Sequence, residues 1–263
     1  MAGLTAKTPS ATYKDLLKIE NSNSGVDDTL RQVESGDGTG SALYIEKNSI
    51  RIQPTADDTN AFHVRDDDGN VKFTVDTTND LVSSLGHYNN TQYAYFGTDY
   101  IDFSSSSANT HYAVPFSGAN GGSTGTNDVD FGTGTDPDDT FTTANTNTQY
   151  ASQLVPTLWR VPDNITIDSV THIEGADAAT GDTTRMHLKS FTFTSGATSC
   201  LTAGALLAHN SDVTNAGNEQ PYLSTWTVDS ADVDANKVIL CFFRSDSVNS
   251  DFSINVTVKY HLR

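Results

Sequence analysis

The sequence predicts an all-β fold, in which an N-terminal arm and a β-hairpin stalk precede a C-terminal antiparallel β-sandwich that is jelly-roll-like. Two observations lead to this fold class. From Ser41 onward, apolar residues alternate with polar ones at the two-residue period of a strand with one wet face. The segments between these alternating runs are rich in Thr, Ser, Asn, Asp and Gly, which favour turns.

Changes of composition along the chain predict five regions. They are an N-terminal anchoring arm over residues 1–40, a β-structured stalk and trimerisation segment over 41–85, an aromatic-rich region of short strands over 86–117, a Gly- and Asp-rich linker or loop over 118–145, and the β-sandwich over 146–263. A chain of 263 residues is long enough for the sandwich to bury a sizeable core.

The arm contains one short apolar cluster. Leu16, Leu17 and Ile19 could share one face of a helix capped by Thr12, although an extended arm would suit the same residues. So short a helix is not stable alone in water, and we therefore expect the segment to dock on another protein. The residues predicted to anchor it are Tyr13, Leu16, Leu17 and Ile19.

Residues 61–76 predict a β-hairpin with one apolar face. Its turn runs from Asp66 to Asn70 and contains Gly69, which can take a positive φ. A hairpin alone is marginal in water, so this face needs a cover. The same hairpin from neighbouring copies would supply one, which predicts a homotrimer; packing on the C-terminal domain is the alternative. The predicted subunit-interface residues are Phe62, Val64, Val71, Phe73 and Val75.

About eight strand-like runs separated by polar turns lie beyond Thr146 and predict the sandwich. The last of them, Phe252 to Leu262, alternates most clearly. The nearly continuous apolar run from Lys237 to Arg244 predicts a central strand. Leu154 to Val161 is also expected to be a strand, and Leu201 to Ala208 either a buried strand or one to two helical turns.

Composition and motifs argue against several functions. The formal net charge is −18, with 33 acidic and 15 basic residues, which disfavours nucleic acid and anionic membranes as partners. No apolar run is long enough to insert into a membrane, and residues 2–11 lack the apolar segment of a secretory signal. The motifs of metallohydrolases, nucleophile elbows and phosphate-binding loops are absent, so we expect no catalytic residue, no cofactor and no enzymatic activity.

The cysteines and the Asp-rich turns each have two interpretations. Cys200 and Cys241 could pair, but free buried thiols in a reducing cytoplasm are the favoured interpretation. The Asp-rich segments at 66–70 and 128–139 could hold a hard cation such as Ca²⁺. Because such turns are usually solvated and neither matches a calcium loop, we predict no metal site.

Aromatic residues are the candidates for ligand contact, because an exposed ring can stack on the face of a sugar. Trp159 and Trp226 are the predicted positions of possible glycan contact, together with the tyrosines between Tyr88 and Tyr112. Packing in a core or at a subunit interface is the alternative role of these rings.

Several segments resemble the structural appendage proteins of tailed bacteriophages. The resemblance lies mainly in residues 8–52, with Tyr-Lys-Asp-Leu-Leu at 13–17, Asn-Ser-Asn-Ser-Gly at 21–25, Thr-Leu-Arg-Gln-Val at 29–33 and Gly-Thr-Gly-Ser-Ala-Leu-Tyr-Ile at 38–45. The hairpin segment 61–79 looks like a unit of phage fibre stalks. Together these segments cover about a quarter of the chain.

The resemblance implies a non-enzymatic virion structural protein, a trimeric head fibre or capsid decoration protein displayed on the virion surface after synthesis in the host cytoplasm. Its expected partners are copies of itself and phage capsid or tail proteins. The alternative is a tail fibre or spike that acts as a receptor- or glycan-binding adhesin, with a host-surface glycan as its partner.

Overall fold

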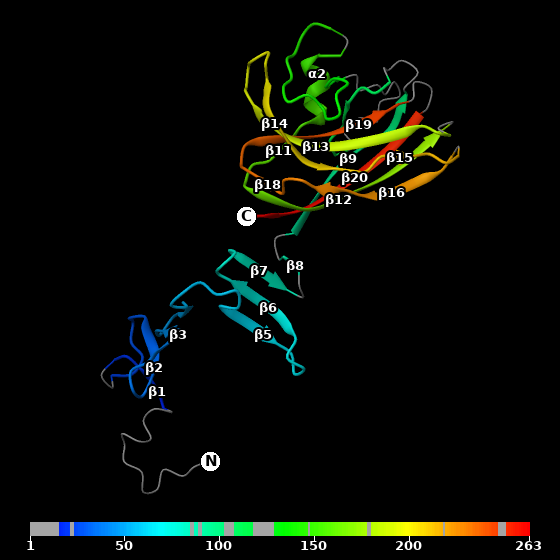
Figure 1. Cartoon of the computed structure of the whole chain (residues 1–263). Coiled ribbons are helices and arrows are strands. Elements are labelled where there is room, and N and C mark those ends of the chain that lie inside the picture. The colour runs from blue at the N-terminus through cyan, green and yellow to red at the C-terminus, as the bar shows by residue number, and fades with distance from the viewer. Residues whose placement is uncertain are drawn as a thin grey trace. The chain divides into compact units, whose positions relative to one another are not determined.

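The computed structural model of the chain describes residues 16–21, 24–84, 87–88, 91–102, 108–117, 129–146, 148–177, 180–217, 219–246 and 251–263. The chain divides into two compact units, Met1–Asn89 and Asn90–Arg263, and nearly all of the regular secondary structure described in them is strand (Figure 1). Paired strands run antiparallel in both units. The all-β sandwich class expected from the sequence is confirmed.

The first unit contains two four-stranded meanders. One has the order β1-β2-β3-β4 and the other β5-β6-β7-β8. Their bounds are β1 Leu17–Ile19, β2 Arg31–Ser35, β3 Gly40–Ile45, β4 Ile50–Ile52, β5 Phe62–Arg65, β6 Val71–Asp76, β7 Leu81–Ser84 and β8 His87–Tyr88. Strands that follow each other in sequence also pair with each other, so local turns determine both meanders.

The predicted hairpin is present as β5 and β6. Gly69 in its turn has a φ of 84°, a conformation that costs glycine little. Asp66 Oδ1 accepts a hydrogen bond of 2.7 Å from the backbone N–H of Asn70, and its other oxygen lies 2.8 Å from Lys72 Nζ. These contacts, the largest being that with Lys72, lower the pKa of Asp66. The Asp-rich sequence therefore closes a turn through its own side chain.

The second unit is a sandwich of two sheets. The seven-stranded sheet has the order β10-β19-β13-β14-β17, with β11 paired to β19 and β15 to β13. Its strands are β10 Tyr112–Val114, β11 Trp159–Arg160, β13 Thr183–Phe193, β14 Leu201–His209, β15 Val213–Thr214, β17 Thr227–Val228 and β19 Lys237–Ser245. As predicted, β19 is a central strand, and residues 201–208 are a strand rather than helical turns.

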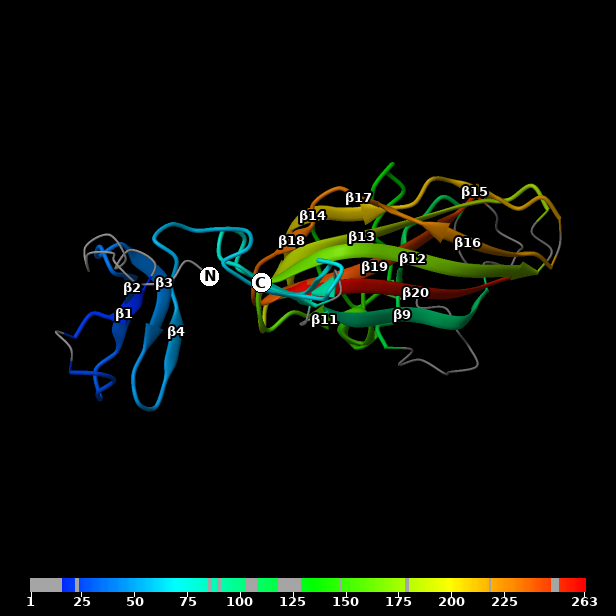
Figure 2. The ribbon, with the colours of Figure 1, turned by 90° about the horizontal axis from the view of Figure 1, so that it is seen from below.

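The other sheet of the sandwich has the order β16-β12-β20-β9, with β18 paired to β12. Its strands are β9 Thr91–Asp102, β12 Ile165–Asp177, β16 Pro221–Thr225, β18 Asp232–Val233 and β20 Asp251–Leu262. Figure 2 looks onto this sheet, where β12, β20 and β9 lie side by side. The chain crosses repeatedly between the two sheets, as when β12 is followed by β13 and β19 by β20.

Two apolar clusters hold the second unit together. The larger lies between the sheets and includes Phe96, Val256 and Phe243. The smaller lies on the outer face of the seven-stranded sheet, where Phe131 and Phe141 pack on Phe191, Phe242 and other side chains of β13 and β19. The helix α2, Ala151–Leu154, adds Leu154 to this outer layer (Figure 1).

The sandwich begins earlier than the sequence predicts. Residues 86–117 were assigned a region of their own, but β9 and β10 are strands of the two sheets. Residues 118–128 lie outside the described part, whereas the rest of the expected linker 118–145 packs on the sheet through buried Phe131 and Phe141. The boundary between the two units falls at Asn89. Residues 129–145 belong to the second unit because Phe131 and Phe141 are part of its core.

The boundary predicted at residue 40 between arm and stalk is also wrong. It falls at the turn between β2 and β3, two strands of one meander. Leu17–Ile19 is strand β1, so this part of the expected anchor is extended rather than helical.

Half of the expected strand from Leu154 to Val161 is helical instead. It contains the end of α2 and the 3₁₀ turn Val155–Thr157, and only Trp159–Arg160 is a strand. Pro156 lies near the start of the 3₁₀ turn, where the missing N–H costs little. Within the described residues, no helix has the length and apolar character needed to cross a membrane.

Candidate functional site

The β5–β7 sheet has an apolar face with no cover in the described part of its unit. Phe62 pairs with Val75 and Val75 with Val82, so the three side chains form one row across the strands. Val64 and Phe73 form the next row, and the rings of Phe62 and Phe73 lie 6.1 Å apart. The apolar face, as used below, consists of Phe62, Val64, Val71, Phe73, Val75 and Val82.

Exposure shows how incompletely this apolar face is buried. The exposed fractions are 42% for Phe62, 48% for Val64 and 37% for Val71, whereas Phe73 and Val75 are half-buried. All five residues predicted as a subunit interface are therefore brought together on one surface. Val82, on the third strand, was missed because the sequence analysis ended the hairpin at β6.

The β1–β4 sheet has a similar, smaller surface. Ile50 pairs with Ile45 and Ile52 with Leu43 across β3 and β4, so these side chains share a face. Ile50 and Ile52 are exposed, and their partners are half-buried. Among the residues described before Asn90, Val33 is the single buried apolar side chain. The described part of the first unit therefore has no core comparable with that of the second.

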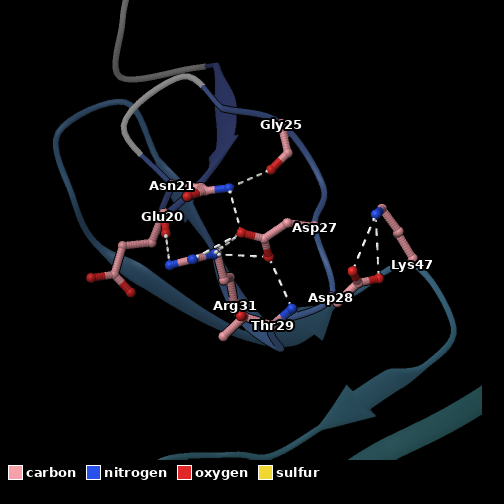
Figure 3. Close-up of polar contacts among 8 residues, drawn as sticks. All are labelled: Glu20, Asn21, Gly25, Asp27, Asp28, Thr29, Arg31 and Lys47. Carbon is pink, nitrogen blue, oxygen red and sulfur yellow. Dashed lines mark hydrogen bonds and ion pairs between the residues drawn. The ribbon is translucent and has the colours of Figure 1, made fainter.

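Polar contacts organise the loop between β1 and β2 instead. Figure 3 shows Asp27 at their centre. Its carboxylate accepts hydrogen bonds from Arg31 Nη2 at 2.9 Å, from the Thr29 backbone N–H at 2.9 Å and from Asn21 Nδ2 at 3.2 Å. The hydrogen bond from Arg31, followed by that from Thr29, lowers the Asp27 pKa to about 2. Hydrogen bonds to the charged carboxylate of Asp27, rather than buried side chains, therefore hold the loop.

The predicted anchoring residues are partly described. Tyr13 lies outside the described residues. Leu16 and Leu17 are exposed, while Ile19 is half-buried and pairs with Val33. Strand β1 is at one edge of its sheet, so its outward backbone groups have no strand partner within that sheet. An edge strand that carries one exposed leucine and follows directly on a second is a surface suited to association.

The two tryptophans are core residues. Trp159 stacks on Phe116, with ring centroids 5.8 Å apart and planes 4° apart, and Trp226 donates a 2.6 Å hydrogen bond from Nε1 to His172 Nδ1. Both side chains are buried, so neither ring is accessible to a sugar. Both pack in the core, which was the alternative role considered for them. Tyr93 and Tyr95 on β9 are the aromatic candidates that do remain exposed.

A polar layer on the outer face of the seven-stranded sheet was missed. Along β13, Arg185, His187 and Lys189 alternate with apolar side chains that point into the sandwich. Lys189 Nζ donates a 2.6 Å hydrogen bond to the carbonyl of Pro137 and lies 2.5 Å from Asp139. Basic residue types at every second position of a strand with apolar neighbours were the available signal.

Two histidines of this layer are fully buried. The rings of His111 and His187 lie 4.9 Å apart. Burial lowers the pKa of His111 to about 4 and that of His187 to about 3, and for His187 the charge of His111 contributes next. Both rings are therefore neutral at pH 7.

Cys200 and Cys241 are buried free thiols, as favoured from the sequence. Burial raises the pKa of both thiols, which keeps them protonated and unreactive at neutral pH. The part of the chain that is described contains no group of three or more His, Cys, Asp or Glu side chains that could hold a metal ion.

The chain matches no protein-family model, and no curated protein resembles it closely enough to count as a relative. The residues and their geometry are therefore the basis for assigning a function.

Proposed function

We propose that this chain is a non-enzymatic structural protein of a tailed-bacteriophage virion, a homotrimeric head fibre or capsid decoration protein displayed on the particle surface. In this proposal the first unit assembles with other copies and with the capsid, and the second unit is the displayed domain. The resemblance of residues 8–52 and 61–79 to phage appendage proteins supports the viral assignment.

The uncovered apolar face of β5–β7 is the observation that carries the proposal. Three or more strands with an apolar face are stable when that face is covered. Fully burying one valine or phenylalanine side chain contributes about 1.5–3 kcal/mol. The face holds six such residues, and Val33 is the single buried apolar side chain described in its unit. Cover from outside the unit would therefore stabilise it substantially.

Other copies of the chain are the cover that we propose. Each copy carries the same face, and rotation about a threefold axis would bring three Phe62 and three Val64 side chains together. The formal charge of −18 on each chain disfavours unspecific association, so a specific apolar contact is needed to hold copies together.

The mass of the purified full chain tests this proposal. Light scattering is expected to give three times 28.2 kDa, with a slow band on an unheated SDS gel if the strands interlock. A single mass of 28.2 kDa at all concentrations would refute the homotrimer.

A further inference from the structure

A cavity of about 220 Å³ lies at one end of the outer face of the seven-stranded sheet. Arg185 on β13 and Arg244 on β19 are directly opposite each other in the antiparallel register, so their side chains leave the sheet on the same face. The cavity is lined by Asn109, Thr183, Thr184, Arg185, Asp212, Arg244 and Asp246. It belongs to the second unit alone, so it does not depend on the proposed assembly.

Two opposed arginines are unfavourable unless anions compensate them. Arg185 Nε lies 3.4 Å from Asp212 Oδ1, yet this nitrogen is buried and has no hydrogen-bond partner among the described residues. Because Nε is shielded from solvent, an anion in the cavity would contact the terminal nitrogens of the guanidinium group, whose charge the long contact with Asp212 compensates only in part.

Arg244 is likewise incompletely compensated. One of its terminal nitrogens, Nη2, donates a 2.8 Å hydrogen bond to Asn109 Oδ1. In the described part of the chain Arg244 forms no ion pair, and Asp246 Oδ1 accepts a 2.7 Å hydrogen bond from the Thr183 backbone N–H. Two guanidinium groups thus face one cavity with donors left over for an oxyanion.

The remaining lining defines the charge and shape of that anion. Asp212 and Asp246 are exposed carboxylates beside the arginines, and they disfavour a multiply charged anion such as phosphate. The same carboxylates, with the Asn109 amide, accept hydrogen bonds from hydroxyl groups. Because the cavity is smaller than the usual 300–1,000 Å³ of drug-sized sites, it suits one small ring or the end group of a longer chain.

We propose that this cavity binds a monoanionic sugar acid of the uronic-acid type. Its carboxylate would bind between Arg185 and Arg244, and its hydroxyl groups would donate to the surrounding oxygen atoms. This assigns the second unit a recognition site that does not depend on exposed aromatic rings.

Isothermal titration calorimetry of the full chain with sodium glucuronate tests the proposal. A dissociation constant of roughly 1 mM is expected for a ligand of this size at ordinary efficiency. Glucose has the same ring without the carboxylate and should bind about tenfold more weakly or worse. Equal binding of glucose, tighter binding of inorganic phosphate, or no glucuronate binding would overturn the proposal.

Substitutions of the two arginines test whether glucuronate binds in this cavity. Arg244→Gln and Arg185→Gln should each weaken glucuronate binding about tenfold or more, as expected for a lost charge-assisted hydrogen bond. Arg160→Gln is the matched control, because it removes the same charge from an exposed side chain of β11 outside the cavity. Arg244→Lys keeps the charge but loses the planar donor pair, and should also weaken binding. If the glutamine variants fail to fold, Arg244→Lys decides, and wild-type affinity there would overturn the proposal.

Discussion

The two units of this chain show two ways of stabilising antiparallel sheets. In the second unit, apolar side chains fill a layer between two sheets and a further layer outside one of them. In the first unit, two meanders are held by local pairing and by polar contacts such as those of Asp27, and Val33 is the single buried apolar residue described there. The second unit thus buries its apolar side chains within itself, whereas the first, in its described part, leaves the apolar face of β5–β7 uncovered.

The largest expected effect is the loss of stability when a core side chain of the second unit is removed. Phe242 is fully buried in the outer cluster, and Phe242→Ala should cost about 3–5 kcal/mol. In a domain of this size that lowers the unfolding temperature by roughly 10 °C. Scanning calorimetry should show this shift in a transition that does not depend on protein concentration.

Phe62→Ala is the matched variant in the first unit. Its ring is 42% exposed within one chain, so the loss should appear in a transition whose temperature rises with protein concentration. If both alanine variants shift the same single transition by equal amounts, the distinction between the units is wrong.

A smaller effect concerns two buried histidines of the second unit. His111 and His187 have pKa values lowered from 6.5 to about 4 and about 3. Below pH 6.5 the unfolded chain therefore takes up protons that the folded one does not, and stability falls as the pH decreases toward these values. The loss for each histidine is at most about 1.4 kcal/mol per pH unit.

Urea unfolding of the second unit at pH 7, 6 and 5 measures this loss. His187→Gln should make the dependence on pH shallower, because one of the two imidazoles with a lowered pKa is gone. His63→Gln, on exposed β5 of the first unit, should leave the dependence unchanged. An identical pH dependence in His187→Gln and the wild type would contradict the lowered pKa of His187.

The smallest expected effect is at the polar loop of the first unit. Asp27→Asn removes the charge that Arg31 and Thr29 contact, and should speed hydrogen exchange at the Thr29 amide. Because the pKa of Asp27 is lowered from 3.8 to about 2, its contribution is complete above pH 3.8 and is lost as the pH falls through 2.

Asp28→Asn is the control for that loop. Asp28 is largely exposed and pairs with Lys47 at 3.3 Å, and exposed ion pairs contribute little. Its substitution should leave Thr29 exchange unchanged, and equal acceleration in both variants would show that Asp27 has no special role.

Local patterns were sufficient for several strands, in both units. The hairpin at β5 and β6 followed from period-two alternation around a turn with Gly69, and β20 from uninterrupted alternation. Both signals are contained within about fifteen residues, so a sequence shows them directly.

The sequence alone does not show which residues pack together when they are far apart along the chain. Phe131 and Phe141 lie in a segment whose composition is typical of loops, and their burial depends on contacts with Phe191 and Phe242 far along the chain. The burial of Trp159 similarly depends on Phe116. The cavity at Arg185 and Arg244 exists because β13 and β19 are register partners, which no local pattern specifies.

The central claim is that other copies of the chain cover the apolar face of β5–β7. Val64→Lys and His63→Lys test it most directly, because these neighbours on β5 point to opposite faces of the sheet and both are exposed. Light scattering of the two full-length variants at equal concentration is the measurement. The account predicts a trimer for His63→Lys and dissociation to 28.2 kDa for Val64→Lys. The same trimeric mass for both variants would contradict it.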